Sequence, residues 1–318
     1  MSHTKPWRVA IGVLAVVLGT GSAHAALPRT FVSGTGIDSN PCSRTAPCRS
    51  FAVALTNTLP GGEIYVLDSA GYGTVTINQA VSIVNQTASA AATAFSGTAI
   101  TIAAGPGDKV LLRGLTIVGA NTASNGIVFS SGDSLSVEDC SISQFTFGGI
   151  LFEPNLPADL TISRTRVANL GTGGVGIYIN PVIPAGLGKV TATLVEVEAI
   201  DTAQAGVFVD GRQSNQNVKL FATVANSVLA DSALDGVHAV TSASGAPTYL
   251  MVRDTTISNN GFGTSSEGGA TVAVAHSTIS GNGQAFFTGS GSNTDSYGDN
   301  NVDGNGTLGP APTTIIFH

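Results

Sequence analysis

Charged residues are scarce in this chain, and their scarcity excludes two classes of structure. Only 10% of the 318 residues are Asp, Glu, Lys or Arg, too few to provide the polar faces of many amphipathic helices. A disordered chain combines high charge with low hydrophobicity, whereas 42% of these residues are hydrophobic. The 40 glycines suit many short strands joined by tight turns. We therefore expect an all-β protein.

Tryptophan and long apolar runs are also nearly absent. The single Trp is Trp7, within the first 25 residues, and the other aromatic residues are five Tyr and 13 Phe. This composition argues against a broad aromatic surface on which sugar rings stack. No later segment approaches the ~20 consecutive apolar residues that a membrane-spanning helix needs. We expect no membrane span.

The first 25 residues have the pattern of a secretory signal peptide. Lys5 and Arg8 precede a short apolar run, Val9–Leu18, and Ala23–Ala25 has the A-x-A form of a cleavage site. A membrane anchor is the alternative, but the run is too short to cross a bilayer. We expect cleavage after Ala25 and a secreted or periplasmic protein. Of 13 basic residues, 11 then face 20 acidic ones, a net charge of −9 that disfavours nucleic-acid partners.

A six-residue pattern repeats along the chain, with one aliphatic residue followed five places on by another. It occurs at Leu112/Ile117, Val137/Ile142, Ile162/Val167, Ala192/Val197, Val252/Ile257 and Val274/Ile279, with a polar-ended variant at Tyr297/Val302 and a shorter one at Val224/Val228. The units lie about 22 to 32 residues apart, the spacing of one structural coil per repeat. Apolar and polar residues alternate within each unit, which indicates extended strands. The sequence predicts a solenoid of stacked strands.

Glycine and asparagine recur at fixed places between these units. Most units restart at a glycine followed by a β-branched residue, at Gly126-Ile127, Gly149-Ile150, Gly176-Ile177, Gly206-Val207 and Gly236-Val237. The last three units also place Asn260, Asn282 and Asn305 eight residues after their first apolar position. Stacked asparagine side chains hydrogen-bond from coil to coil. We expect an internal asparagine ladder rather than ligand contacts.

The three cysteines have two expected roles. Cys42 and Cys48 flank a short Pro-containing loop, and in an exported protein this spacing favours a local disulfide over a metal site. Cys140 lies three residues after Val137, at a position that is small or apolar in other units. We expect its thiol to fill the core and to stay unpaired.

The chain divides into four parts in this interpretation. Residues 1–25 are the signal peptide, 26–60 an N-terminal cap, 61–306 the solenoid and 307–318 a C-terminal strand or cap. Within the N-terminal cap, the apolar spacing of Arg49–Leu59 predicts a short helix. Such a helix covers the otherwise exposed core of the first coil.

These features resemble a known family. The units Val252–Asn260 and Val274–Asn282 are similar to the repeat of the right-handed parallel β-helix of the pectin-lyase-like superfamily. The segments Gly34–Pro41 and Ala46–Leu55 resemble the cap that opens many such proteins. The resemblance implies a right-handed parallel β-helix of about nine or ten coils, with a lateral groove on its loop-bearing side. We expect a monomer.

The resemblance does not select an activity, because the superfamily holds lyases, hydrolases, epimerases, tailspikes and non-catalytic surface proteins. The Trp-Ile-Asp-His and Arg-x-Pro-x-x-Arg motifs of pectate lyases are absent. Asn293–Asp295 matches the first element of polygalacturonases, but no Gly-His-Gly and no Lys or Arg follows it. We interpret this match as a coincidence.

One column of titratable residues is the leading candidate for a catalytic or metal site. Two residues after the first apolar position, the units place Gly114, Asp139, Arg164, Leu194, Asn226, Asp254, His276 and Asp299. Equivalent residues of neighbouring coils stand roughly 4.8 Å apart, so Asp254, His276 and Asp299 form a carboxylate–imidazole–carboxylate file. Such a file suits general acid–base catalysis or a divalent cation, and Arg253 lies beside it. The alternative is an exposed column whose charges are solvated.

Other charged groups are weaker candidates. Asp139 and Arg164 fit an ion pair between coils. Asp231, Asp235 and His238 share one turn and the start of the next strand. In a further group, Glu196 and Glu198 face outward from one strand with Arg166 one coil away from Glu196, a pattern that leaves a paired-carboxylate hydrolase open.

Two functions of different classes follow. In the first, the protein is exported and binds, and in an enzymatic version cleaves, a polysaccharide or cell-surface glycan along its lateral groove, with Ca²⁺ as an optional cofactor. In the second, it is a non-catalytic structural or adhesive surface solenoid. The missing lyase and hydrolase motifs, the removal of Trp7 with the signal peptide and the scarcity of Lys and Arg favour the non-catalytic function. The family resemblance favours polysaccharide binding. The sequence leaves open whether the protein is an enzyme.

Overall fold

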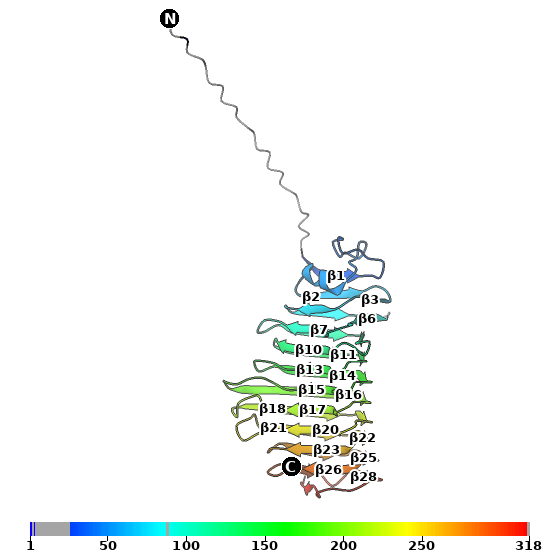
Figure 1. Cartoon of the computed structure of the whole chain (residues 1–318), viewed down its shortest axis with the longest axis vertical. Coiled ribbons are helices and arrows are strands. Elements are labelled where there is room, and N and C mark those ends of the chain that lie inside the picture. The colour runs from blue at the N-terminus through cyan, green and yellow to red at the C-terminus, as the bar shows by residue number, and fades with distance from the viewer. Residues whose placement is uncertain (2, 4–25, 87–88, 317–318) are drawn as a thin grey trace.

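The computed structural model describes residues 1, 3, 26–86 and 89–316, and it shows an elongated solenoid of stacked strands (Figure 1). Nearly all of the predicted signal peptide lies outside the described residues. Two sheets, one of 20 strands and one of nine, run along the solenoid, and their strands pair in parallel. The predicted all-β solenoid is confirmed.

The nine-stranded sheet receives one strand from each coil. Its strands are β4 (Val75–Ile77), β7 (Thr98–Ala103), β10 (Asn125–Ser131), β13 (Gly148–Phe152), β15 (Val175–Ile179), β17 (Ala205–Asp210), β20 (Asp235–Val240), β23 (Phe262–Glu267) and β26 (Gln284–Thr288). Nine strands in one sheet agree with the predicted nine or ten coils.

The larger sheet covers two sides of the solenoid and bends at a corner between them. On the first side lie β1 (Leu27–Val32), β2 (Thr58–Val66), β5 (Val81–Val84), β8 (Lys109–Arg113), β11 (Ser134–Glu138), β18 (Val218–Ala225), β21 (Thr248–Arg253), β24 (Thr271–Ala275), β27 (Asn293–Ser296) and β29 (Thr313–Thr314). On the second lie β3 (Ala70–Gly71), β6 (Ala90–Thr93), β9 (Leu115–Val118), β12 (Ser141–Ser143), β19 (Val228–Ala230), β22 (Thr256–Ser258), β25 (Thr278–Ser280) and β28 (Asn301–Asp303). The long strands β14 (Asp159–Ala168) and β16 (Gly188–Ile200) continue through the corner.

The observed register confirms most of the repeat and corrects three units. Ile162 pairs with Leu194, so the unit predicted as Ala192/Val197 is Leu194/Ala199. Val224 is followed after five residues by fully buried Leu229, and the predicted shorter unit with Val228 was wrong. The last unit is Ser296/Val302, with one extra residue at its corner. Adjacent apolar residues made the inward-facing member ambiguous in the first two units.

The predicted titratable column is the corner of the larger sheet. Its residues have left-handed backbone angles, with φ between 45° and 56° at Asp139, Arg164, Glu196, Asn226, Asp254 and His276. Glu196 therefore occupies the place predicted for Leu194, which instead points into the core and is fully buried. Asn and Asp tolerate this conformation, which fits the polar character of the column.

The restart glycines form a file of close contacts between coils. A Cβ atom on Gly126 would lie 2.5 Å from the carbonyl oxygen of Gly149, and one on Gly149 would lie 2.6 Å from that of Gly176. The same relation continues through Gly206 and Gly236. Only glycine permits this approach of one coil to the next, while the residue after each glycine stacks in the core.

The asparagine ladder is confirmed. Oδ1 of Asn282 accepts hydrogen bonds from the backbone and side-chain nitrogens of Asn260, and Asn305 accepts the equivalent pair from Asn282. The side-chain nitrogen of Asn282 also donates to the Ile257 carbonyl. A parallel ladder of hydroxyl groups runs through Ser227, Thr255 and Ser277.

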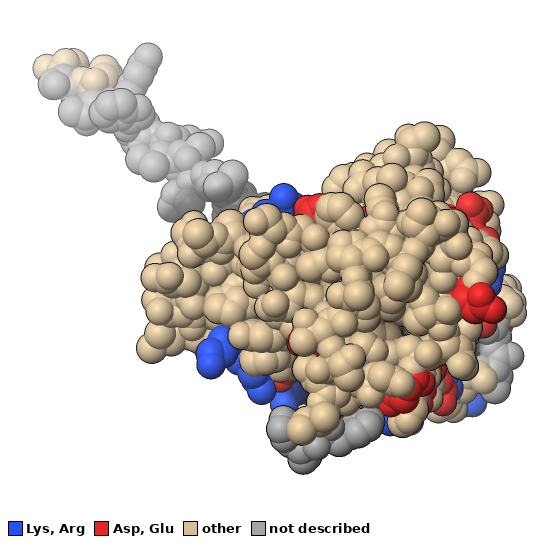
Figure 2. Space-filling view, turned by 90° about the horizontal axis from the view of Figure 1, so that it is seen from below, with Lys and Arg blue, Asp and Glu red and all other residues tan. Residues whose placement is uncertain are grey.

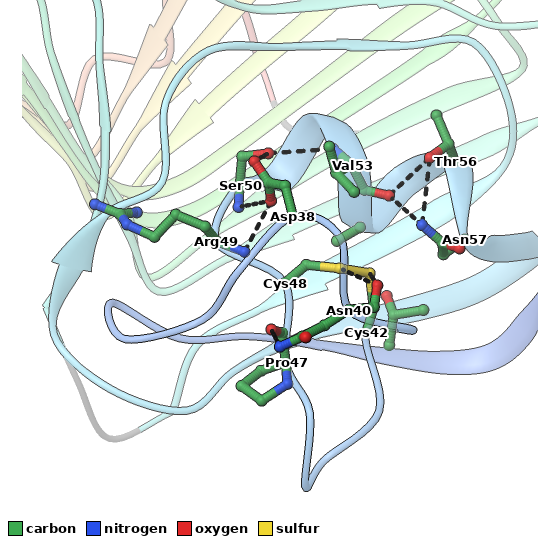
Figure 3. Close-up of a disulfide and its surroundings, with 12 residues drawn as sticks. Asp38, Asn40, Cys42, Pro47, Cys48, Arg49, Ser50, Val53, Thr56 and Asn57 are labelled. Carbon is green, nitrogen blue, oxygen red and sulfur yellow. Dashed lines mark hydrogen bonds between the residues drawn. A yellow bond between two sulfur atoms is a disulfide. The ribbon is translucent and has the colours of Figure 1, made fainter. Parts of the chain in front are cut away.

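The N-terminal end holds the short helix α1 (Phe51–Thr56), which packs against β1, β2 and β4. It is shorter than the predicted Arg49–Leu59 because Ser50 is its N-cap and Thr58 already begins β2. Asp38 accepts hydrogen bonds from the backbone nitrogens of Arg49 and Ser50 and so fixes the start of the helix (Figure 3). The boundary expected between residues 60 and 61 falls inside β2, and the division into four parts stays a prediction.

Cys42 and Cys48 are joined by a disulfide beside this helix, as predicted (Figure 3). Both are fully buried. Cys140 is a free, buried cysteine at the corner of the larger sheet, also as predicted.

The C-terminal end is closed by a short segment. β29 pairs with β27, and Thr307 bridges to Gln284 of β26. Residues 304–316 include no charged side chain, and the end of the solenoid seen in Figure 2 is largely uncharged.

We expect thiol-alkylating reagents to label only Cys140, and only after unfolding. Burial raises the pKa of the Cys140 thiol to about 12, so the reactive thiolate is rare at neutral pH. Mass spectrometry of protein alkylated without reductant, before and after denaturation, tests this. Labelling of Cys42 or Cys48 in either sample would contradict the disulfide.

Replacing Asn282 by alanine should lower the free energy of unfolding by about 1–3 kcal/mol. The change leaves the buried donors of Asn260 without their acceptor and opens the middle of the ladder. Urea unfolding followed by circular dichroism measures the difference. Asn293→Ala, at an exposed position of β27, is the matched control and should stay within about 0.5 kcal/mol of the parent.

Candidate functional site

A stack of three rings lies on the outer face of the nine-stranded sheet. Each follows one of the inward-pointing restart residues, so the alternation of the strand turns it outward. The rings of Tyr178 and Phe208 are 4.9 Å apart at their centroids, and those of Phe208 and His238 are 4.5 Å apart, with interplanar angles of 21° and 14°. The rings stack because register places them side by side on β15, β17 and β20.

An acidic residue and an arginine adjoin one end of this stack. Asp210 ends β17 with its side chain 2% exposed, and it accepts hydrogen bonds from Nε and Nη2 of Arg212 at 2.9 and 2.6 Å. The Tyr178 hydroxyl also donates to Asp210 at 3.0 Å. Burial by itself raises the pKa of Asp210, but these bonds and the Arg212 charge outweigh it and hold the pKa below its usual value. Burial and the adjacent carboxylate raise the pKa of Tyr178.

Two carboxylates flank His238 at the other end. Nδ1 of His238 lies 3.2 Å from Asp235, whose other oxygen accepts a hydrogen bond from the Ser265 hydroxyl. Nε2 lies 3.7 Å from Glu267. This nitrogen is buried and has no hydrogen-bond partner among the described residues. The imidazole is thus close to a carboxylate on each side, but its Nε2 makes no hydrogen bond among the described residues.

We call Glu267, His238, Asp235 and Ser265 the His238 cluster. The exposed fraction of the side chain decreases from Glu267 through His238 to Asp235. The side chain of Glu267 is 44% exposed, that of His238 17% and that of Asp235 11%. Glu267 is therefore the member that meets solvent and any ligand on the sheet, with His238 behind it. A carboxyl group backed by an oriented imidazole is suited to general acid–base catalysis.

The file predicted from the sequence does converge. Nε2 of His276 lies 3.2 Å from Asp299, and Nδ1 lies 3.9 Å from Asp254. Arg253 contacts Asp254 at 2.8 Å. The file stands at the corner of the larger sheet, however, and the His276 side chain is 58% exposed. Its role as a catalytic site stays a prediction.

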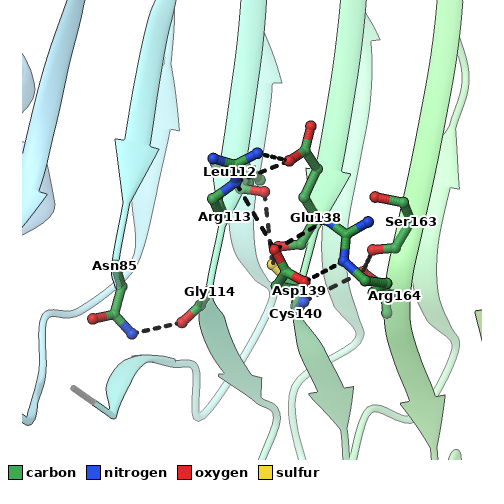
Figure 4. A network of polar contacts seen from close by, with 10 residues as sticks. Asn85, Leu112, Arg113, Gly114, Glu138, Asp139, Cys140, Ser163 and Arg164 are labelled. Carbon is green, nitrogen blue, oxygen red and sulfur yellow. Dashed lines mark hydrogen bonds and ion pairs between the residues drawn. The ribbon is translucent and has the colours of Figure 1, made fainter. Parts of the chain in front are cut away.

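The rest of the corner carries a network of ion pairs. Arg164 contacts Asp139 at 2.6 Å, as predicted, and Arg113 pairs with Glu138 and approaches Asp139 at 3.9 Å (Figure 4). Asp139 has a lowered pKa because of the hydrogen bond and charge of Arg164. A groove of about 370 Å³ is lined by Asp139, Arg164 and Glu196 of this corner.

The other weak candidates are only partly brought together. Arg166 pairs with Glu198 at 2.8 Å, so the predicted proximity to Glu196 was wrong. The register explains the error: Glu196 is at the corner, whereas Glu198 is directly opposite Arg166. Asp235 joins His238, but among the described residues no ion pair links Asp231 to His238.

A metal ion is not favoured by the donor groups. Among the described residues, no three His, Cys, Asp or Glu side chains are arranged to hold one. The optional Ca²⁺ stays a prediction, and no chemical step below depends on it.

Sequence reasoning missed Tyr178, Phe208, Asp210, Arg212 and Glu267. A usable signal existed: the residue after each glycine and β-branched pair forms its own column, and that column contains Tyr178, Phe208 and His238. The predicted site instead came from the column that contains Asp254, His276 and Asp299. The partners Asp210 and Glu267 needed the register of the nine-stranded sheet.

Comparison with known proteins bears on the fold. No protein-family model matches the chain, and no curated protein matches it by sequence. Among solved structures, pectate lyase Pel9A superposes with a TM-score of 0.65 at 14% identity, over 91% of this chain and 80% of that one. An alginate lyase from Paenibacillus sp. str. FPU-7 superposes with a TM-score of 0.52 at 14% identity, over 91% and 100%. The chain is a right-handed parallel β-helix, the fold that it shares with these two lyases.

Proposed function

We propose that this protein is an exported, monomeric β-helix protein that binds a polysaccharide on the outer face of its nine-stranded sheet and cleaves it at the His238 cluster. The observation that carries the proposal is the orientation of the His238 imidazole: its Nδ1 lies 3.2 Å from Asp235, and its buried Nε2, which makes no hydrogen bond among the described residues, lies 3.7 Å from the exposed Glu267. Strongly oriented but incompletely paired polar groups are characteristic of functional sites.

The ring stack supplies the binding surface in this proposal. Sugar rings have apolar CH faces that pack on aromatic side chains, while their hydroxyl groups hydrogen-bond to nearby polar groups. Tyr178 and Phe208 provide the apolar part, and Glu267, whose side chain is 44% exposed, provides an acceptor beside His238. The structural neighbours are named as lyases of two polysaccharides, which is consistent with a glycan ligand.

Export is supported by the cysteines. The buried disulfide between Cys42 and Cys48 is of the kind that persists in oxidising compartments. No helix in the described part of the chain is both long and apolar enough to cross a membrane. Mass spectrometry of the protein from culture medium and periplasm should find an N-terminus at Ala26.

Glu267 is the proposed general acid–base residue, and His238 positions it. A glycosidic oxygen placed on the sheet would accept the proton of the Glu267 carboxyl as its bond to the anomeric carbon breaks. The oxygen of a water molecule would bond to that carbon and release one proton to solvent, so each cleavage consumes one water. His238, fixed through Asp235 and Ser265, limits the orientations that the carboxyl group adopts.

Phe208→Ala should weaken glycan binding about tenfold, which corresponds to about 1.4 kcal/mol, because it removes the middle ring of the stack. Phe221→Ala is the matched control. Phe221 stacks on Tyr249 with centroids 5.2 Å apart, but on the larger sheet, and 38% of it is exposed. Affinity electrophoresis through gels containing soluble polysaccharides compares the two. Equal effects of the two variants would contradict binding at the ring stack.

Glu267→Gln should lower the cleavage rate about 10²- to 10⁴-fold while leaving binding nearly unchanged, because it removes the transferable proton and keeps the shape. Reducing-end assays and absorbance of unsaturated products, with and without Ca²⁺, measure cleavage by either chemistry. His276→Ala tests the corner file. Loss of cleavage there, with Glu267→Gln active, would place the chemistry at Asp254, His276 and Asp299. Binding without any cleavage would support the adhesive, non-catalytic alternative.

A further inference from the structure

We infer that the glycan taken by the nine-stranded sheet carries no carboxylate groups, an inference that rests on the function proposed above. The first observation is the distribution of cations. None of the nine strands contains a Lys or an Arg. The strands of the larger sheet carry eight, namely Arg29, Lys109, Arg113, Arg164, Arg166, Lys189, Lys219 and Arg253.

The one arginine next to the ring stack is already neutralised. Arg212 follows β17 and makes two hydrogen bonds with the buried carboxylate of Asp210. Arg212 is 51% exposed and keeps N–H groups that these bonds do not use, but a sugar carboxylate that bound them would compete with the carboxylate of Asp210 for the same positive charge. Removing one partner of such a buried pair is strongly unfavourable.

The remaining charges around the stack are negative. Asp235 and Glu267 flank His238, and Glu153 contacts Asn180 on the strand side next to Tyr178. A polyuronate laid on this surface would bring like charges together where the protein partly excludes water, so their repulsion is screened less than in bulk solvent.

The N-terminal part of the same face is neutral. A groove of about 470 Å³ lies where α1 meets β4 and β7, and its lining contains no charged residue. Thr76 and Thr101 of this groove occupy the same row of the sheet as the ring stack. Threonine, asparagine and glutamine groups suit the hydroxyl groups of an uncharged sugar. Nothing there compensates a carboxylate.

The test is a comparison of binding constants for the whole chain. Isothermal titration with polygalacturonate and alginate as polyuronates, with galactan, xylan and mixed-linkage glucan as uncharged polymers, and with chitosan as a cationic one, covers the classes. Each titration is run with and without Ca²⁺ and at low and high ionic strength. At least one polymer without carboxylates should bind about tenfold more tightly than either polyuronate. For an uncharged polymer, the binding constant should change little with salt.

Variants test whether the preference for glycans without carboxylates depends on Phe208, Glu267 and Asp210. Phe208→Ala should weaken binding of the preferred polymer, and Phe221→Ala should not. Glu267→Gln should raise affinity for polyuronates relative to the parent, because it removes one repelling charge from the exposed part of the site. Asp210→Asn frees the guanidinium of Arg212 and should do the same; circular dichroism checks that it folds.

The outcomes separate this inference from the proposed function. A polyuronate that binds as tightly as the best polymer without carboxylates, with or without Ca²⁺, overturns the inference and leaves glycan binding intact. Polyuronate affinity that falls in Glu267→Gln also overturns it. If no polymer of any class binds, the proposed function itself fails, and the inference fails with it.

Discussion

Parallel, in-register pairing of one coil with the next is the constraint on which the whole molecule depends. Each strand hydrogen-bonds to the equivalent strand of its neighbours, so side chains at one position in the repeat stack on one another along the solenoid. The core rows of Ile, Val and Leu, the asparagine ladder and the file of restart glycines are all results of this rule. A polar or charged residue stacks in the same way, so the rule also builds sites.

The two candidate sites show how the same rule gives different chemistry on different surfaces. At the corner, the left-handed backbone of Asp254 and His276 turns their side chains toward solvent, and His276 is 58% exposed. On the flat nine-stranded sheet, His238 is packed against Phe208 and held by Asp235, with 17% of its side chain exposed. Water solvates the two charges of an exposed ion pair and weakens the attraction between them. The partly buried group keeps a defined orientation, which is what acid–base chemistry needs.

The two sheets also differ in their charged residues. Lys and Arg on the strands of the larger sheet mostly pair with carboxylates of a neighbouring coil, as Arg164 does with Asp139 and Arg166 with Glu198. Each of these ion pairs combines one positive and one negative charge, so the pairs add no net charge to that surface. The nine-stranded sheet has no such cations and concentrates rings, hydroxyl groups and a few carboxylates. A ligand therefore meets two chemically distinct surfaces on one narrow rod.

The sequence by itself determined the class of fold, the disulfide and the asparagine ladder, because these depend on local patterns. The two-residue alternation sets strands, Cys42 and Cys48 are close along the chain, and Asn260, Asn282 and Asn305 recur at one place in the repeat. It did not determine the register wherever two neighbouring residues were both apolar. This is why Glu196 was replaced by Leu194 in the predicted column, and why Glu198 rather than Glu196 proved to face Arg166.

Only the tertiary structure decided which residues gather around the ring stack. Asp210, His238 and Glu267 lie on three different coils and are separated by loops of unequal length, so no fixed spacing in the sequence joins them. Burial, which distinguishes His238 from His276, likewise depends on what stacks above and below each residue. The repeat dictates which way a side chain points. The pairing of coils across variable loops dictates what that side chain meets.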